Sequence, residues 1–255
     1  MSYFVFDLDE TLAQIYTVYY FVASLQTYPN MSESLTNSLK KAYKIFVKKI
    51  VKEEIKNPLG VLRPGILHIM KKLYELYIEG KVKGVIIYSN NGHLYSLKFI
   101  RDLIHEYIGD KFIIECVYRY HHLREKDDKT WDELKRILTK GKCKARNVKP
   151  HDVYFFDDIE HKDLYKKLEN YNQVPEYNFK ASFDRIANIY KDILVDREFI
   201  EILKNEKIKN IDDVIEIFRD GTQDTEWIPP EPDDGIKMML DAIKNIKVLG
   251  KRKIY

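Results

Sequence analysis

The feature that most constrains the fold is a short apolar segment that ends in two carboxylates. Residues Tyr3 to Leu8 are mostly aromatic or β-branched, so they are expected to form a buried β-strand. Asp7 and Asp9 then fall at the carboxyl end of this strand, where open α/β sheets place their ligands. Two carboxylates so close together repel each other, and a divalent cation or a shared proton is the usual remedy. An acidic loop that caps the next helix is the alternative interpretation.

Strands and helices alternate along the chain, which predicts an α/β fold with a Rossmann-like parallel sheet and helices on both faces. Further strands are expected at residues 82–89, 112–118, 152–156 and within 171–179. We expect residues 1–180 to form this core, with a helical insertion at about 13–60. Residues 181–255 are expected to form a mainly helical C-terminal extension.

The helical insertion has an apolar face from Leu35 to Val51 and an opposite face rich in lysine. Asn30 is its expected N-cap, with Glu33 as the capping-box partner. Because an insertion after the first strand emerges at the carboxyl edge of the sheet, it could act as a small cap that offers cations to an anionic substrate. A solvated helix face is the alternative.

Three more strand or helix ends carry polar residues. The apolar strand that begins at Val82 ends in Ser89 and Asn90, and a helix is expected to open at Lys129. A further apolar strand ends in Asp157 and Asp158. In a parallel sheet these ends meet at one edge, so the side chains are expected to lie close to Asp7 and Asp9.

Together these segments resemble the four motifs of the haloacid dehalogenase superfamily of phosphohydrolases. Asp7-x-Asp9-x-Thr11 resembles the first motif, and the other three segments follow in the order that the family shows. Glu10 and the segment Arg63-Pro64-Gly65 resemble the branch that dephosphorylates the C-terminal domain of RNA polymerase II, which includes phosphatases related to the NLI-interacting factor. The lysine-rich insertion and the long C-terminal region depart from that branch, which puts its substrate specificity in doubt.

The resemblance implies that Asp7 is a nucleophile that forms an aspartyl-phosphate and that Asp9 is the general acid and base. It also implies a Mg²⁺ ion held by Asp7, the backbone carbonyl of Asp9, Asp157 and Asp158. We favour Asp158 as a direct ligand, with Asp157 nearby or bonded to Lys129. The lysine would neutralise charge on the nucleophile and on the transferring group.

The substrate phosphate is expected to bind Thr11, Ser89 and the amide of Asn90. Thr11 would act mainly by supporting the turn that carries Asp9. Ser89 has an alternative role as a cap of the next helix. Lys129 has competitors for its role in the same region of the chain, namely Lys126, Lys140 and Lys142.

The net charge of +3 on 255 residues is too small to indicate nucleic acid from the total. Cys116 and Cys143 have no metal-site spacing and suggest a reducing compartment. No signal peptide or membrane-spanning run is apparent, so we expect a soluble cytoplasmic protein; the nucleus and a viral source both stay open. The basic segment 135–149 joins a helix back to a strand and is expected at the edge away from the site.

The leading functional hypothesis is a Mg²⁺-dependent phosphatase that acts on a phosphoprotein at serine or threonine. A phosphatase of nucleotides or nucleic-acid ends is an alternative. A catalytically silent relative that serves as a structural or interaction protein is another, and an unrelated acidic metal site, as in a nuclease or nucleotidyltransferase, is a third. The oligomeric state stays open.

Overall fold

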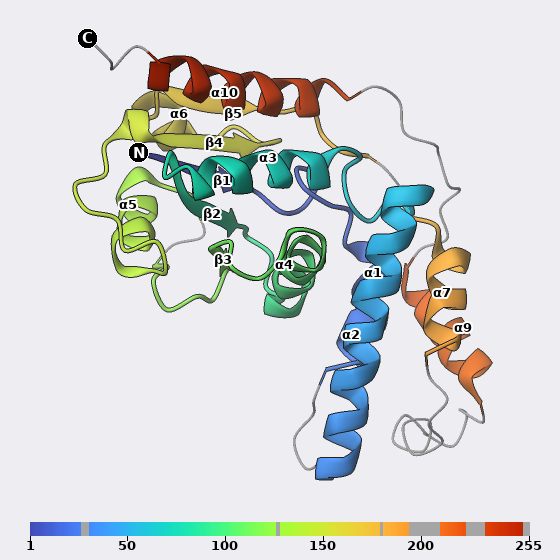
Figure 1. Cartoon of the computed structure of the whole chain (residues 1–255). Helices are drawn as coiled ribbons and strands as arrows, with labels where there is room; N and C mark the ends of the chain where they lie inside the picture. The colour runs from blue at the N-terminus through green and yellow to red at the C-terminus, as the bar shows by residue number, and fades with distance from the viewer. Residues whose placement is uncertain (27–30, 126–127, 179–180, 194–209, 223–232, 252–255) are drawn as a thin grey trace. The chain divides into compact units, whose positions relative to one another are not determined.

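The computed structural model describes residues 1–26, 31–125, 128–178, 181–193, 210–222 and 233–251. The chain divides into two compact units. The sheet unit comprises Met1–Ala13, Arg63–Asn178 and Pro230–Tyr255, and the helical unit comprises Gln14–Leu62 and Phe179–Pro229. Figure 1 shows their elements.

The sheet unit contains five parallel strands in the order β3-β2-β1-β4-β5. Their bounds are Ser2–Phe6 for β1, Val82–Tyr88 for β2, Ile114–Val117 for β3, Val153–Asp157 for β4 and Asn170–Gln173 for β5. The expected α/β class with a parallel, Rossmann-like sheet is therefore confirmed. Phe6 pairs with Ile87 of β2 and with Phe156 of β4, so the carboxyl ends of three adjacent strands lie at the same level.

Helices cover both faces of this sheet. They are α3 (Ile66–Ile78), α4 (Leu94–Ile108), α5 (Trp131–Lys140), α6 (Lys162–Lys167) and α10 (Asp234–Lys251). Helices α3 and α4 contact each other beside β2 and β3, and α5 and α6 contact each other on the other face. Helix α3 contacts β2, α4 and α10, while α5 and α6 share a core with the opposite face of the strands.

Strand β1 is aromatic or aliphatic from Tyr3 to Phe6 because both of its faces are buried there. Val5 packs in the core that α5 and α6 share with the sheet. The rings of Phe4 and Phe6 stack on those of Tyr154 and Phe156, with centroids 5.0 Å apart in each pair. This burial on two sides explains why the sequence shows a continuous apolar run before Asp7.

The helical unit is built from α1 (Tyr16–Ser24), α2 (Glu33–Lys56), α7 (Phe183–Lys191) and α9 (Ile211–Thr222). Its core is aromatic: the ring of Tyr190 lies within 6.2 Å of those of Phe21, Phe46 and Phe218. The hydroxyls of Ser24 and Tyr190 lie 2.7 Å apart. The insertion after β1 thus shares one core with residues that follow 180.

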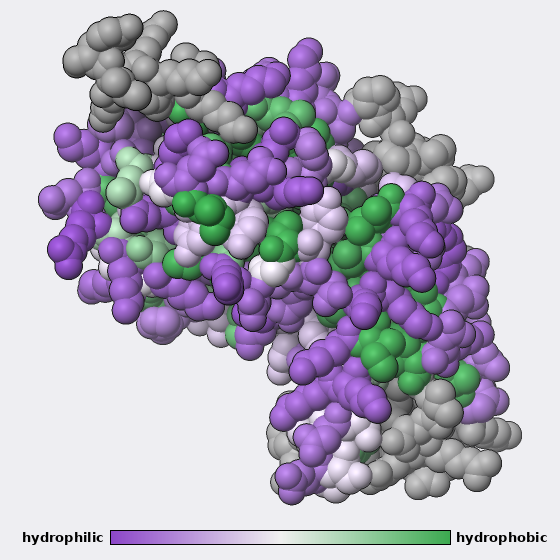
Figure 2. Space-filling view, in the orientation of Figure 1, coloured by the Kyte–Doolittle hydropathy of each residue, from purple (hydrophilic) through white to green (hydrophobic). Residues whose placement is uncertain are grey.

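Helix α2 begins at Glu33, and its N-cap is Ser32, whose hydroxyl accepts a hydrogen bond from the Leu35 amide at 3.1 Å. The expected cap, Asn30, lies outside the described residues. Six lysines of the helix are exposed, namely Lys40, Lys41, Lys44, Lys48, Lys52 and Lys56. This exposure supports the solvated-face interpretation, and the cap role stays a prediction. Figure 2 shows hydrophilic residues over most of the visible face.

The division into units differs from the boundary expected at 180, because the C-terminal helix α10 belongs to the sheet unit. The Arg63 guanidinium pairs with Asp233, just before α10. An added Cβ at Gly65 would lie 3.2 Å from the Ile236 side chain, so the two segments are in close contact. Within the described part of the chain, none of the helices has the length and apolar character needed to cross a membrane.

Candidate active site

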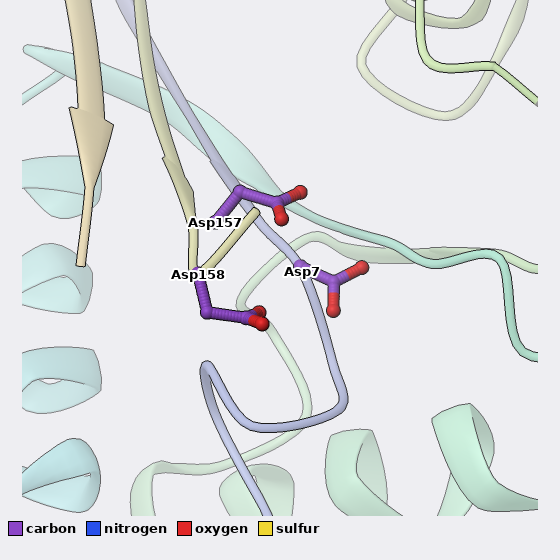
Figure 3. Close-up of side chains that lie close together, drawn as sticks. All are labelled: Asp7, Asp157 and Asp158. Carbon is purple, nitrogen blue, oxygen red and sulfur yellow. The ribbon is translucent and has the colours of Figure 1, made fainter. Parts of the chain in front are cut away.

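Three aspartates from two neighbouring strands converge at the carboxyl edge of the sheet. Asp7 directly follows β1, and its amide donates to the Phe156 carbonyl at 2.9 Å, so it continues the pairing with β4. Asp157 is the last residue of β4, and Asp158 follows it. One carboxylate oxygen of each lies within 4.8 Å of the others. Figure 3 shows that the three carboxylates extend in the same general direction.

The buried ammonium of Lys129 joins two of these aspartates. It donates a hydrogen bond to Asp7 and another, 2.6 Å long, to Asp157. Lys129 lies two residues before the start of α5, so the approach to this helix delivers the charge to the site. The expected pairing with Asp157 is thus present. His161 Nε2 also lies 3.1 Å from Asp157 Oδ2.

The competing lysines have other positions in the chain. Lys140 ends α5, and Lys142 lies in the connection from α5 to β4, where its amide donates to Glu115 at 2.9 Å. This connection enters β4 at its amino end, as expected for the basic segment 135–149. Lys126 lies outside the described residues.

Burial and one lysine set the electrostatics of the cluster. Burial raises the pKa of Asp7 well above its ordinary value, although Lys129 opposes this. Burial also acts to raise the pKa of Asp157, but Lys129 and His161 hold it below its ordinary value. Burial would lower the pKa of Lys129, yet Asp7 and Asp157 raise it. If Asp7, Asp157 and Asp158 are all ionised, Lys129 leaves a formal charge of −2.

A divalent cation matches that charge, and carboxylate oxygens are the ligands that Mg²⁺ prefers. Asp157 Oδ2 already accepts from Lys129 and lies beside His161, and Asp157 Oδ1 accepts from the Ile159 amide at 3.0 Å. Asp7 and Asp158 are therefore the better direct ligands. The donor set is compatible with Mg²⁺, and an acidic cluster of this kind also occurs without an ion.

Thr11 connects the turn after β1 to the end of β4. Its buried hydroxyl donates to Asp158 Oδ1 at 2.9 Å and accepts from the Asp158 amide at 3.0 Å. Both of the hydroxyl's contacts therefore orient Asp158, which agrees with a supporting role for Thr11.

Arg63 contacts the backbone of the same turn. Its guanidinium donates to the Thr11 carbonyl at 2.9 Å, to the Pro175 carbonyl and to the Asp233 carboxylate. The Arg63 side chain is 1% exposed, so these acceptors replace water around a buried charge. The Arg-Pro-Gly segment was noted in the sequence for its resemblance to a phosphatase branch, but this role of Arg63 was not predicted.

Asp9 faces the loop that follows β2. Its carboxylate accepts from the Asn91 side-chain amide at 3.1 Å and from the Ser89 hydroxyl at 3.4 Å. The Asn91 backbone amide donates in turn to the Ser89 hydroxyl at 3.0 Å. Burial raises the pKa of Asp9 above its ordinary value. Asn91 was not among the predicted residues, although it directly follows Ser89 and Asn90.

Arg124 fixes the loop that carries Ser89. It donates to the Ser89 carbonyl at 2.7 Å, to the Asn90 side-chain oxygen at 2.8 Å and to Glu133 at 3.1 Å. Its side chain is 1% exposed. Arg124 thus engages the side-chain oxygen of Asn90, whereas the groups of Asn90 suited to a phosphate are its donors, the backbone amide and the side-chain NH₂. No local pattern marks Arg124.

The structure thus gathers all eight predicted site residues at the carboxyl edge of β1, β2 and β4. Lys129 and Thr11 join the aspartates of β1 and β4, while Ser89 lies beside Asp9. Comparisons of the chain with family models, with curated proteins and with solved structures found no match.

Proposed function

We propose that this chain is a Mg²⁺-dependent phosphohydrolase that cleaves a phosphomonoester through an aspartyl-phosphate, with the haloacid dehalogenase type of site. The observation that carries the proposal is the position of Lys129, whose buried ammonium joins Asp7 to Asp157 beside Asp158. A purely structural ion pair would not need a third aspartate directed at the same point.

The first step is attack by an Asp7 oxygen on phosphorus. A bond from Asp7 to phosphorus forms while the bond from phosphorus to the leaving oxygen breaks, and Asp9 gives its proton to that oxygen. The raised pKa of Asp9 favours the protonated form that this step needs. Asn91 and Ser89 hold the Asp9 carboxyl in place.

The second step returns the enzyme to its starting state. Asp9, now ionised, takes a proton from water, and the water oxygen attacks phosphorus and releases Asp7 as a carboxylate with inorganic phosphate. Lys129 keeps its proton throughout and stabilises negative charge on Asp7. Mg²⁺, held by Asp7, Asp158 and the Asp9 carbonyl, would neutralise charge on the phosphoryl oxygens.

The direct test is hydrolysis of glycerol phosphate and an aryl phosphate, with and without Mg²⁺, by wild type and Asp7→Asn. We expect metal-dependent turnover that Asp7→Asn abolishes, and a phosphorylated wild-type intermediate that hydroxylamine cleaves. Asp110→Asn, at an exposed aspartate after α4, is the matched control and should keep activity. Turnover that survives in Asp7→Asn, or no wild-type turnover on any phosphomonoester, would contradict the proposal. The phosphoprotein substrate suggested by the resemblance stays a prediction.

A further inference from the structure

The loops at the carboxyl edge of the sheet differ in chemistry on the two sides of Asp7. Those after β1, β4 and β5 are acidic and carry Asp9, Glu10, Asp158, Glu160 and Glu176. The segments Ser89–Arg101 after β2 and Tyr118–Arg124 after β3 contain no Asp or Glu, although Glu125 and Asp128 follow later in the second loop. The residues that directly follow β2 and β3 therefore carry no carboxylate, unlike those that follow β1 and β4.

The segments that directly follow β2 and β3 carry several aromatic rings and an exposed guanidinium. We call the following residues the aromatic rim: His93, Tyr95, Tyr118, Arg119, Tyr120 and His122. Tyr120 is 69% exposed and Tyr95 is 42% exposed, values that are high for large rings. The Arg119 guanidinium lies 5.8 Å from the centroid of the Tyr120 ring, and the Tyr118 ring meets the same ring edge-on at 6.3 Å. Exposed rings thus lie beside cations.

The aromatic rim contacts the loop after β2 that orients Asp9, the proposed general acid. The Arg119 amide donates to the Asn91 carbonyl at 3.0 Å, and Asn91 in turn donates to Asp9. An added Cβ at Gly92 would lie 3.3 Å from the Tyr120 ring, so the ring packs against this loop. The aromatic rim therefore adjoins the loop that contacts Asp9, the residue that would protonate the leaving oxygen.

We propose that the leaving group carries a nucleobase, so that the substrate is a nucleoside phosphomonoester, either a free nucleotide or the terminal phosphate of a single-stranded nucleic acid. The base stacks on Tyr120, and Arg119 and the rim histidines face the adjoining phosphates. Aromatic rings with neighbouring cations form platforms of this type, which accept any base because every base has a π-face. This inference rests on the proposed phosphohydrolase function.

The test compares kcat/KM on a nucleoside monophosphate, on short oligonucleotides with a 5′ or 3′ terminal phosphate, on a phosphoserine peptide and on glycerol phosphate, which has no ring. We expect Tyr120→Ala to lower the ratio of nucleotide to glycerol phosphate kcat/KM roughly 5- to 100-fold. Tyr120→Phe keeps the ring and should stay within about twofold of wild type. Tyr165→Ala removes another exposed tyrosine, from α6, and should leave the ratio unchanged.

A second measurement does not depend on turnover. Fluorescence anisotropy of the Asp7→Asn protein with labelled oligonucleotides in Mg²⁺ should show binding that weakens with salt and with Tyr120→Ala. A rise in kcat/KM with oligonucleotide length would identify nucleic-acid ends as the source, and equal values would identify free nucleotides. Preference for the phosphopeptide, or an unchanged ratio in Tyr120→Ala, would overturn this inference and leave the phosphohydrolase intact. If the wild type hydrolyses none of these phosphomonoesters, the proposed function itself is overturned.

Discussion

Thr11 and Asp158 exchange two hydrogen bonds although 147 positions separate them in the sequence. The hydroxyl donates to the carboxylate at 2.9 Å and accepts from the backbone amide at 3.0 Å. The Thr11 side chain is fully buried, so no water can replace either bond without rearrangement. The orientation of a proposed Mg²⁺ ligand on β4 is therefore fixed from the turn after β1.

Replacing Thr11 with valine keeps the shape of the side chain and removes both hydrogen bonds. We expect Thr11→Val to lower the free energy of unfolding by about 1–3 kcal/mol, because the Asp158 amide and carboxylate lose a buried partner. We also expect weaker Mg²⁺ binding, measured by calorimetric titration. Thr11→Ser keeps the hydroxyl and should retain most of the affinity. Wild-type Mg²⁺ affinity in Thr11→Val would contradict the supporting role of Thr11.

The pair formed by Arg63 and Asp233 should connect the C-terminal helix to activity. Asp233→Asn removes the charge that faces a buried guanidinium, and breaking such a pair costs about 3–5 kcal/mol. We expect lower stability in urea unfolding and lower kcat, because Arg63 also holds the Thr11 carbonyl. Asp184→Asn disrupts the exposed pair with Arg219 and should cost less than about 1 kcal/mol. If Asp233→Asn and Asp184→Asn lower the free energy of unfolding equally, the buried pair does not stabilise the protein more than the exposed pair.

The part of the site that sequence could predict lies in short segments. Continuous apolar residues precede both Asp7 and Asp157 in the sequence. This pattern arises because β1 and β4 are buried on both faces of the sheet, so both strand ends could be predicted. The parallel topology then brings the strand ends together without any further signal. Lys129 could be predicted because a capped helix start follows it at Thr130.

The contacts that orient these residues could not be predicted in the same way. Arg124 meets Ser89 across 35 positions, and Asp233 meets Arg63 across 170. Such pairs depend on which loops the fold brings together, and neither partner has a local pattern. The grouping of α10 with the sheet unit has the same origin, since helical periodicity at 236–246 does not reveal that α10 packs against α3.

Removing the Lys129 ammonium should make the acidic cluster depend on pH and metal. We expect Lys129→Met to lower the free energy of unfolding by about 3–5 kcal/mol at neutral pH, because Asp7 and Asp157 lose their buried counter-charge. Burial already raises the pKa of Asp7, and without the ammonium it rises further, so stability of the variant should increase as pH falls.

Mg²⁺ gives this variant a second readout. An ion that binds the folded state alone raises the melting temperature by mass action, so millimolar Mg²⁺ should raise that of Lys129→Met. Lys140→Met, at the other end of α5, is the matched control and should respond to pH and to Mg²⁺ as the wild type does. If Mg²⁺ does not change the melting temperature of Lys129→Met, the proposed metal site is contradicted.

Glu54 in the helical unit should destabilise the protein as pH rises. Its carboxylate is buried against the loop after α2 and accepts from the Val61 and Leu62 amides at 2.9 and 3.3 Å. Burial raises its pKa from 4.5 to about 7, so between these values the folded state binds more protons than the unfolded state. Stability contributed by this group is therefore greatest below pH 4.5 and declines as pH rises to about 7.

The difference between pKa values of 4.5 and about 7 corresponds to about 3 kcal/mol. Glu54→Gln keeps an oxygen that accepts from the same amides and removes the charge. We expect the variant to match wild type near pH 4.5 and to be more stable above pH 7, measured by urea unfolding followed by circular dichroism. Glu54→Ala loses the acceptor and should be less stable at both values. The same dependence on pH in Glu54→Gln and wild type would show that this carboxyl is not the cause.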